Sequence, residues 1–245
     1  MPTPKDCLAV ALDFANEYEA MKLVDRLDNS CQWYKVGMEL YYAAGNRIVQ
    51  QLRDRGFHIF LDLKLHDIPS TVAGAVRSAT QAGASLLTIH ASGGAAMMTA
   101  AAEAARAPAS PRLLAVTVLT SMDAKELAGL GITASPADQV LRLARLAQAC
   151  GIDGMVCSAE EVAALRKETG PGTLLVIPGI RPSGSATQGA FGNDQKRVAT
   201  PAEAIARGAS MLVVGRPITR ATDPAAAAQA ILKEIEQEIE LALQK

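Results

Sequence analysis

The feature that most restricts the fold of this chain is a series of short apolar runs, rich in valine, isoleucine and leucine. Each run is nearly continuous in hydrophobicity, which is typical of parallel strands covered on both faces. The eight runs are residues 7–13, 33–38, 59–65, 86–90, 113–119, 154–158, 174–180 and 211–215. We therefore expect eight parallel strands.

The segments between these runs have the start and stop signals of helices. After Pro69, the hydroxyls of Ser70 and Thr71 are expected to cap a helix that ends at Gly83. Near the end of the chain, Asp223-Pro224 is expected to open an amphipathic helix. Its apolar stripe consists of Ile231, Ile235, Ile239 and Leu243.

Eight strand–helix units of about 30 residues account for nearly all of a chain of 245 residues. The sequence thus predicts an α/β protein with the (β/α)8 fold, the TIM barrel, as a single domain over residues 1–245. A doubly wound open sheet is the alternative, but its six strands would leave two apolar runs without a place.

Composition excludes several classes of protein. A net charge of −1 and 4% aromatic residues do not suit binding to nucleic-acid polymers. No apolar run reaches the ~18–20 residues of a membrane span, and the first residues do not resemble a signal peptide. Four cysteines lie in or beside apolar runs without Cys-x-x-Cys spacing, so we expect free thiols in a cytoplasmic protein.

Charged residues interrupt the third run, where a buried strand should be apolar. Strand alternation directs the leucines at 61, 63 and 65 toward the helices, and Asp62 and Lys64 toward the barrel interior. Asp67 follows just beyond the strand. Because negative neighbours keep a lysine protonated, Lys64 suits a proton donor better than an imine-forming nucleophile.

The first two runs carry charges as well. Lys35 lies between two buried-type residues of the second run, and Asp13 ends the first. Charges of both signs therefore converge at the carboxyl ends of the strands, where the active sites of TIM barrels lie. A structural ion-pair network is the alternative for any one of these residues. Their convergence at one mouth favours a catalytic site.

The end of the eighth run has the chemistry of a phosphate site. Gly215 permits close approach of a ligand, and the guanidinium of Arg216 offers several donors to a phosphate. The loops after strands seven and eight form the usual phosphate site of this fold. Residues 181–195, rich in proline, glycine and polar residues, predict a lid that adds Gln195.

Other catalytic motifs lack support. His58, His66 and His90 are too few and too scattered for a catalytic triad or a zinc site. The chain has no Gly-x-Gly-x-x-Gly after its first run and no Walker loop, which removes the basis for a dinucleotide or nucleoside-triphosphate site.

The segment Asp62-x-Lys64-x-x-Asp67-Ile68-Pro69-x-Thr71 closely resembles the signature of orotidine 5′-phosphate decarboxylases of the stand-alone bacterial type. The other similar elements, in order, are Ala11-Leu12-Asp13, Tyr34-Lys35-Val36-Gly37, Thr117-Val118-Leu119-Thr120-Ser121, Pro178-Gly179-Ile180-Arg181-Pro182, Asp194-Gln195 and Val214-Gly215-Arg216-Pro217-Ile218. The resemblance implies a carboxy-lyase that converts orotidine 5′-phosphate to uridine 5′-phosphate in de novo pyrimidine biosynthesis.

The resemblance also implies a role for each matching residue. Lys64 would protonate the ring carbon that loses carbon dioxide, in a charge network with Lys35, Asp62 and an Asp67 from the second subunit of a homodimer. The residues implied in substrate binding are Asp13, Lys35 and Thr71 at the ribose, Thr120 or Ser121 at the pyrimidine, and Arg181, Gln195, Gly215 and Arg216 at the phosphate. No metal or organic cofactor is implied.

Two other functions fit parts of this pattern. A sugar-phosphate synthase or a keto-acid sugar-phosphate decarboxylase shares the Asp-x-Lys core but depends on magnesium, so a chelator separates it from a cofactor-independent enzyme. A non-catalytic barrel would bind a phosphorylated ligand without turnover. The complete set of Lys35, Asp62, Lys64 and Asp67 argues against that second reading.

Overall fold

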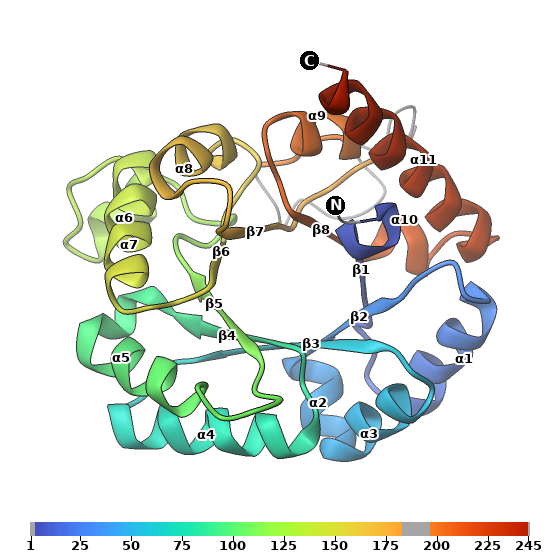
Figure 1. Ribbon diagram of the computed structural model, residues 1–245, viewed down its shortest axis with the longest axis horizontal. Coiled ribbons are helices and arrows are strands. Elements are labelled where there is room, and N and C mark those ends of the chain that lie inside the picture. Colours follow the sequence, from blue (N-terminus) through green and yellow to red (C-terminus); the bar gives the residue numbers. More distant parts are fainter. Residues whose placement is uncertain (1–2, 183–196, 245) are drawn as a thin grey trace.

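The computed structural model describes residues 3–182 and 197–244, which form a closed barrel of eight parallel strands (Figure 1). Each strand pairs with the next, and β8 pairs with β1 through Leu8 and Leu212. The strands are β1 Leu8–Ala11, β2 Trp33–Gly37, β3 His58–Leu65, β4 Leu86–His90, β5 Arg112–Val116, β6 Gly154–Val156, β7 Leu174–Ile177 and β8 Met211–Val214. The predicted barrel is confirmed, and the pairing of β8 with β1 rules out an open sheet.

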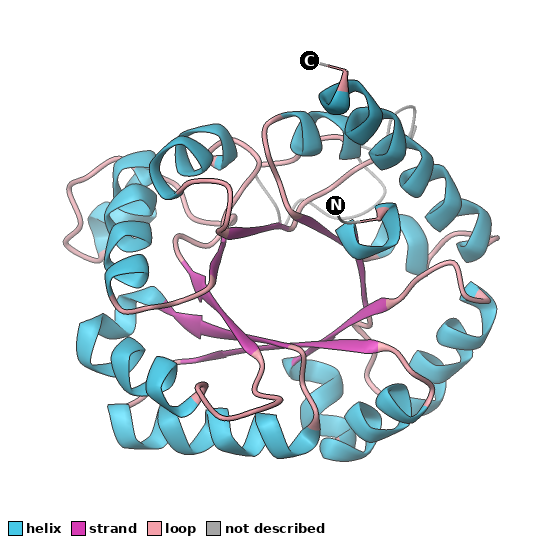
Figure 2. Ribbon diagram, in the orientation of Figure 1, coloured by secondary structure: helices cyan, strands magenta, loops and turns pink. Residues whose placement is uncertain are grey.

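Helices cover the outside of the barrel, as Figure 2 shows. The α-helices are α1 Glu17–Leu27, α2 Met38–Ala44, α3 Asn46–Asp54, α4 Pro69–Ala82, α5 Gly94–Ala104, α6 Ala124–Gly129, α7 Pro136–Ala149, α8 Val162–Thr169, α9 Pro201–Ala206, α10 Arg216–Thr219 and α11 Pro224–Leu243. The 3-10 helices of the described residues, η1 Pro4–Cys7 and η2 Ala91–Gly93, precede β1 and α5.

Several strands are shorter than their apolar runs. The runs predicted to end at residues 13, 119 and 180 leave the sheet after Ala11, Val116 and Ile177. Residues beyond these ends, such as Leu12 and Ile180, are nevertheless buried. Their apolar character therefore reflects packing of the loops that follow the strands, and apolar continuity alone could not mark where the hydrogen-bond ladder stops.

The helix predicted after Pro69 ends where predicted but begins earlier. Gly83 ends α4 in the left-handed conformation at φ +88°, as predicted. The helix begins at Pro69, so Thr71 already lies in its first turn, and Ile68 is the N-cap residue without a side-chain hydrogen bond. Proline fixes the backbone of the first turn and has no N–H to satisfy, which removes part of the need for a capping hydroxyl.

The final helix opens as predicted, because the Asp223 carboxylate accepts a hydrogen bond of 3.0 Å from the Ala226 amide. Its apolar stripe is shorter than predicted. Ile231 and Ile235 are buried, whereas Leu243 is 57% exposed. Residues 241–244 are all exposed, so the last turn extends beyond the surface against which the helix packs.

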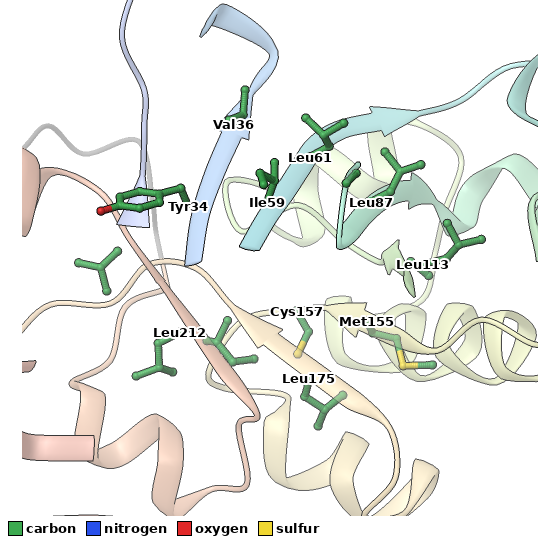
Figure 3. Close-up of a cluster of buried hydrophobic side chains, with 14 of the residues drawn as sticks. Tyr34, Val36, Ile59, Leu61, Leu87, Leu113, Met155, Cys157, Leu175 and Leu212 are labelled. Carbon is green, nitrogen blue, oxygen red and sulfur yellow. The ribbon is translucent and has the colours of Figure 1, made fainter. Parts of the chain in front are cut away.

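The core has two layers. A large outer layer fills the space between strands and helices, and Figure 3 shows part of it, including Tyr34, Leu61 and Leu87. A smaller layer fills the inside of the barrel and consists of Ala9, Ala11, Phe60, Leu86, Leu114, Val176, Met211 and Val213. Residues on the same strand thus alternate between the two layers, which leaves the interior positions nearer the carboxyl ends to polar side chains.

The cysteines are free, as predicted. Cys7, Cys31 and Cys157 are buried and Cys150 is partly buried, and burial raises the pKa of the Cys7 and Cys31 thiols to about 11. No helix in the described part of the chain has the length and apolar character that a membrane crossing requires.

Candidate active site

A cavity of about 630 Å³ opens at the carboxyl ends of the strands. Of the described residues that line it, none comes from β4, whereas β1, β2, β3, β5, β6, β7 and β8 or the loops after them all contribute. The residues predicted for the site that line this cavity are Asp13, Lys35, Asp62, Lys64, Thr120, Arg181, Gly215 and Arg216. The fold therefore brings together residues that lie more than two hundred positions apart in the sequence, such as Asp13 and Arg216.

Four charged side chains form an alternating row along one wall of the cavity. The Lys35 Nζ atom lies 3.0 Å from Asp13 Oδ1 and 3.6 Å from Asp62 Oδ2. The Lys64 Nζ atom lies 2.8 Å from Asp62 Oδ1. Each carboxylate thus has an ammonium partner, and for the largely buried Lys35 and Asp62 this pairing offsets the cost of removing their charges from water.

Strand alternation and the pairing of β1, β2 and β3 produce this row. The neighbours of Lys35 on β2 pack in the outer layer, which turns the Lys35 side chain inward. Gly37, two residues later, leaves room for the ion pair, because a Cβ atom there would lie 3.1 Å from Lys35 Nζ and 3.3 Å from Asp13 Oδ1. A larger residue at this position would crowd the Lys35–Asp13 contact.

Burial and charge act in opposite directions on the two innermost members of the row. Burial alone would lower the pKa of Lys35, but the charges of Asp62 and Asp13 outweigh burial and raise that pKa. Burial would raise the pKa of Asp62, but the charges of Lys35 and Lys64 outweigh burial and lower it. Both groups are therefore ionised at neutral pH.

A second group of cations lines the cavity at the ends of β7 and β8. Arg181 follows β7, and Arg216 follows Gly215 at the end of β8. Arg220, which sequence reasoning missed, also lines the cavity, and its spacing of four residues from Arg216 across the short helix α10 is the signal that could have indicated it. Glu39 was missed as well and lines the same cavity from α2.

Two predicted residues lie outside the cavity of a single chain. Asp67 and Thr71 are exposed at the start of α4 and do not line it. The Asp67 carboxylate accepts a hydrogen bond of 2.6 Å from the Ile68 amide. Gln195, predicted in the lid, lies outside the described residues. In the described ranges, no three His, Cys, Asp or Glu side chains converge in a way that could hold a metal ion.

A buried ion pair behind the cavity wall was also missed. Arg197 pairs with Glu161, and its other terminal nitrogen donates a hydrogen bond of 3.1 Å to the Leu119 carbonyl. The Glu161 carboxylate also accepts hydrogen bonds from the amide and the hydroxyl of Ser158. This pair ties the segments after β5, β6 and β7 to one another beside Thr120.

The comparisons with known proteins agree with one another. The family model described as "Orotidine 5′-phosphate decarboxylase / HUMPS family" matches residues 6–231. Orotidine 5′-phosphate decarboxylase of Nitrosococcus oceani is 52% identical over 232 residues, which are 94% of this chain and 98% of the relative. The corresponding protein of Halorhodospira halophila is 53% identical over 229 residues, 93% of this chain and 95% of the relative.

A solved structure shows the same relationship in three dimensions. The crystal structure of orotidine 5′-phosphate decarboxylase from Lactobacillus acidophilus superposes with a TM-score of 0.82 at 40% identity. The match covers 94% of this chain and 99% of that one. The alternating charges, the cavity at the carboxyl ends of the strands and these matches lead to one conclusion: the chain belongs to the orotidine 5′-phosphate decarboxylase / HUMPS family.

Proposed function

We propose that this protein is a carboxy-lyase that converts orotidine 5′-phosphate to uridine 5′-phosphate and carbon dioxide in pyrimidine biosynthesis. The observation that carries the proposal is the alternating row Asp13, Lys35, Asp62 and Lys64 inside the cavity. Relatives with about half of their residues identical to this chain carry the name of that activity.

Lys64 is the proton donor in this proposal. When the bond between the pyrimidine ring and the carboxylate breaks, carbon dioxide leaves and the electron pair stays on the ring carbon. An ammonium beside that carbon stabilises the developing negative charge and then transfers its proton to form the new C–H bond. The neutral Lys64 amine afterwards takes a proton from water. Asp62, 2.8 Å from Lys64 Nζ, holds the ammonium in place.

Substrate binding uses the rest of the cavity. We assign Asp13 and Lys35 to the ribose and Thr120 to the pyrimidine edge, because they line the walls on either side of Lys64. Arg216 and Arg181 are assigned to the 5′-phosphate, since guanidinium groups bind phosphate with several donors at once. Gly215 lets the phosphate approach the backbone at the end of β8, and Gln195 is kept as a further phosphate contact.

We further propose that two copies of the chain form a homodimer in which Asp67 and Thr71 complete the partner's site. Apolar side chains are exposed just beyond the ends of the two strands that carry the catalytic lysines: Met38 is 44% exposed and Ile68 is 64% exposed. Large apolar side chains exposed beside the site favour contact with another protein.

Mixed dimers test this arrangement. Lys64→Ala and Asp67→Ala subunits are each expected to be inactive alone. In a mixed dimer, one of the two sites combines an intact Lys64 with an intact Asp67, so mixing after dissociation should restore turnover. Failure of mixing to restore any activity, with mixed dimers demonstrated by differential tagging, would contradict a shared site.

Turnover of orotidine 5′-phosphate, followed by ultraviolet absorbance in the presence of a chelator, tests the activity itself. Turnover that the chelator does not affect supports the proposal. Turnover of a sugar phosphate that requires magnesium would instead indicate a related activity on the same scaffold. Binding of uridine 5′-phosphate without any turnover would indicate a ligand-binding barrel.

We also propose that residues 1–245 act as one domain in the cytoplasm. The closed barrel uses strands from both ends of the described chain, which supports one domain. The four cysteines are free, which suits a reducing compartment.

A further inference from the structure

Strand β3 is irregular where it carries the charged residues. Leu61 pairs with Leu87 of β4, but the next pair joins Leu65 with Ile89, so β3 has two more residues than β4 over this interval. Lys64 lies in the left-handed region at φ +50°, which is uncommon for a residue with a side chain. Such a conformation costs free energy of its own, and persists only where surrounding contacts hold it.

Thr88 faces this irregular stretch from the neighbouring strand. It lies between Leu87 and Ile89, both of which pack in the outer layer, so its own side chain points into the barrel. The residue is completely buried and does not line the cavity. Sequence reasoning did not select Thr88, because a threonine within a strand is common.

The hydroxyl of Thr88 contacts both catalytic residues of β3. Its oxygen accepts a hydrogen bond of 2.8 Å from the Lys64 amide, and its proton is donated to Asp62 Oδ1 at 3.0 Å. The same Asp62 oxygen accepts the hydrogen bond from Lys64 Nζ at 2.8 Å. One hydroxyl therefore connects the main chain of Lys64 to the carboxylate that holds the Lys64 ammonium.

We propose that Thr88 is a positioning residue for the decarboxylation. Its hydroxyl positions the Lys64 ammonium through two hydrogen bonds, one with the Lys64 amide and one with the Asp62 carboxylate. The inference rests on the proposed function and extends it to a residue outside the cavity. Through the amide it holds the strained backbone of Lys64, and through Asp62 it fixes the anion that orients the ammonium. Threonine suits this task because its branched side chain has few rotamers and its hydroxyl both donates and accepts.

A purely structural role for Thr88 makes a different prediction. If the hydroxyl only satisfied a buried amide, its removal would lower the stability and leave the chemical step unchanged. If it positions Lys64, its removal lowers kcat while binding of the phosphate group, which is assigned to the arginines at the ends of β7 and β8, is retained. The ratio of effects on kcat and KM therefore separates the two roles.

The test compares Thr88→Val, which keeps the shape and removes the hydroxyl, with Thr88→Ser, which keeps the hydroxyl. For Thr88→Val we expect kcat to fall by about 10- to 100-fold, because a hydrogen bond to a charged group is lost and Lys64 is displaced. KM and the Kd of uridine 5′-phosphate should change by less than about 3-fold. Thr88→Ser should restore kcat to within about 3-fold of the wild type.

The pH profile of kcat provides a second readout. Loss of the Thr88 donor removes one of the contacts that lower the pKa of Asp62, so the acid limb of the profile should move to higher pH in Thr88→Val. Thr169→Val is a matched control, because this buried threonine of α8 donates only to the Leu165 carbonyl and lies outside the cavity lining. It should change neither kcat nor the pH profile.

The outcomes are separable. Absence of turnover in the wild type would overturn both the proposed function and the role of Thr88. Wild-type turnover with an unchanged kcat in folded Thr88→Val would overturn the positioning role alone. Should Thr88→Val fail to fold, Thr88→Cys takes its place in the test, because a thiol is a weak donor and acceptor. The kcat of Thr88→Cys should be lower than that of the wild type but above one-tenth of it. An equal kcat in Thr88→Cys and wild type would contradict the inference.

Discussion

Replacement of Lys64 by alanine removes the ammonium at the end of the alternating row of charges. In the structure, this group lies 2.8 Å from Asp62 Oδ1, and 27% of the Lys64 side chain is exposed to the cavity. The remaining partners of Asp62 are Lys35 at 3.6 Å and the Thr88 hydroxyl at 3.0 Å. Asp62 therefore keeps a cation and a donor, and the fold should tolerate the change.

The magnitude follows from the two tasks of the Lys64 ammonium. Loss of a positioned proton donor costs about 10²- to 10⁴-fold in rate, and loss of a preorganised charge at the reacting centre costs about 10²- to 10³-fold. Both effects act on the same atom and do not multiply fully. We expect kcat to fall by at least about 10⁴-fold, which corresponds to about 5 kcal/mol in the activation free energy.

Two measurements on the same Lys64→Ala protein separate chemistry from binding. Turnover of orotidine 5′-phosphate is followed by ultraviolet absorbance, and the Kd of uridine 5′-phosphate is measured by calorimetry. The Kd should stay within about 10-fold of the wild type, because the arginines at the ends of β7 and β8 remain. Lys167→Ala, in which an exposed lysine of α8 is lost, is the control for removal of a positive charge.

A Lys64→Ala protein that turns over substrate within about 10-fold of the wild type would refute the assignment of Lys64 as proton donor. A large loss of product binding would instead show that Lys64 holds the ligand, and that its contribution is not confined to the transition state.

Three further predictions follow from the geometry. Arg216→Ala should weaken uridine 5′-phosphate binding by about 10- to 100-fold, measured by calorimetry, because a charged hydrogen bond to the phosphate is lost. Glu161→Leu should lower the free energy of unfolding by about 3–5 kcal/mol in urea, because Arg197 is left buried without its partner; the double variant with Arg197→Met should lose less. Asp62 has a lowered pKa, so its contribution to stability is complete above the unfolded value of 3.8 and is lost as pH falls through the folded pKa. In urea unfolding, the difference between wild type and Asp62→Asn should therefore be constant above about pH 5 and shrink below pH 4.

Each of these predictions has a clear contrary result. Unchanged affinity for uridine 5′-phosphate in Arg216→Ala would indicate that the phosphate binds elsewhere in the cavity. A Glu161→Leu protein as stable as the wild type would show that the buried pair contributes nothing net. A stability difference for Asp62→Asn that does not vary with pH would mean that Asp62 has the same pKa in the folded and unfolded states.

The barrel and the direction of its interior charges were predictable because both depend on local pattern. Leu61, Leu63 and Leu65 pack against the outer core, so alternation correctly directed Asp62 and Lys64 inward. The ends of the strands were not predictable in the same way. Residues beyond the strand ends, such as Leu12 and Ile180, are as buried as strand residues, so hydrophobicity does not show where a strand ends.

The contacts that refine the site depend on tertiary structure and had no sequence signal. The stretch from Leu61 to Leu65 contains no glycine or proline, so nothing in it marks the left-handed backbone of Lys64. The contacts of the Thr88 hydroxyl with β3 depend on the altered pairing of β3 with β4. Glu161 and Arg197 are 36 residues apart, and only the return of the chain after β7 brings them together.

Closure of the barrel through β1 and β8 also bears on how the protein is made. Two hundred residues separate Ala11, at the end of β1, from Met211, at the start of β8. At about 5–20 residues per second, the ribosome needs about 10–40 seconds to synthesise that interval. Throughout this time β1 has an edge without its final partner. Any sheet that forms before β8 is made is therefore open at β1, and pairing with β8 covers this exposed edge, which could otherwise pair with another chain.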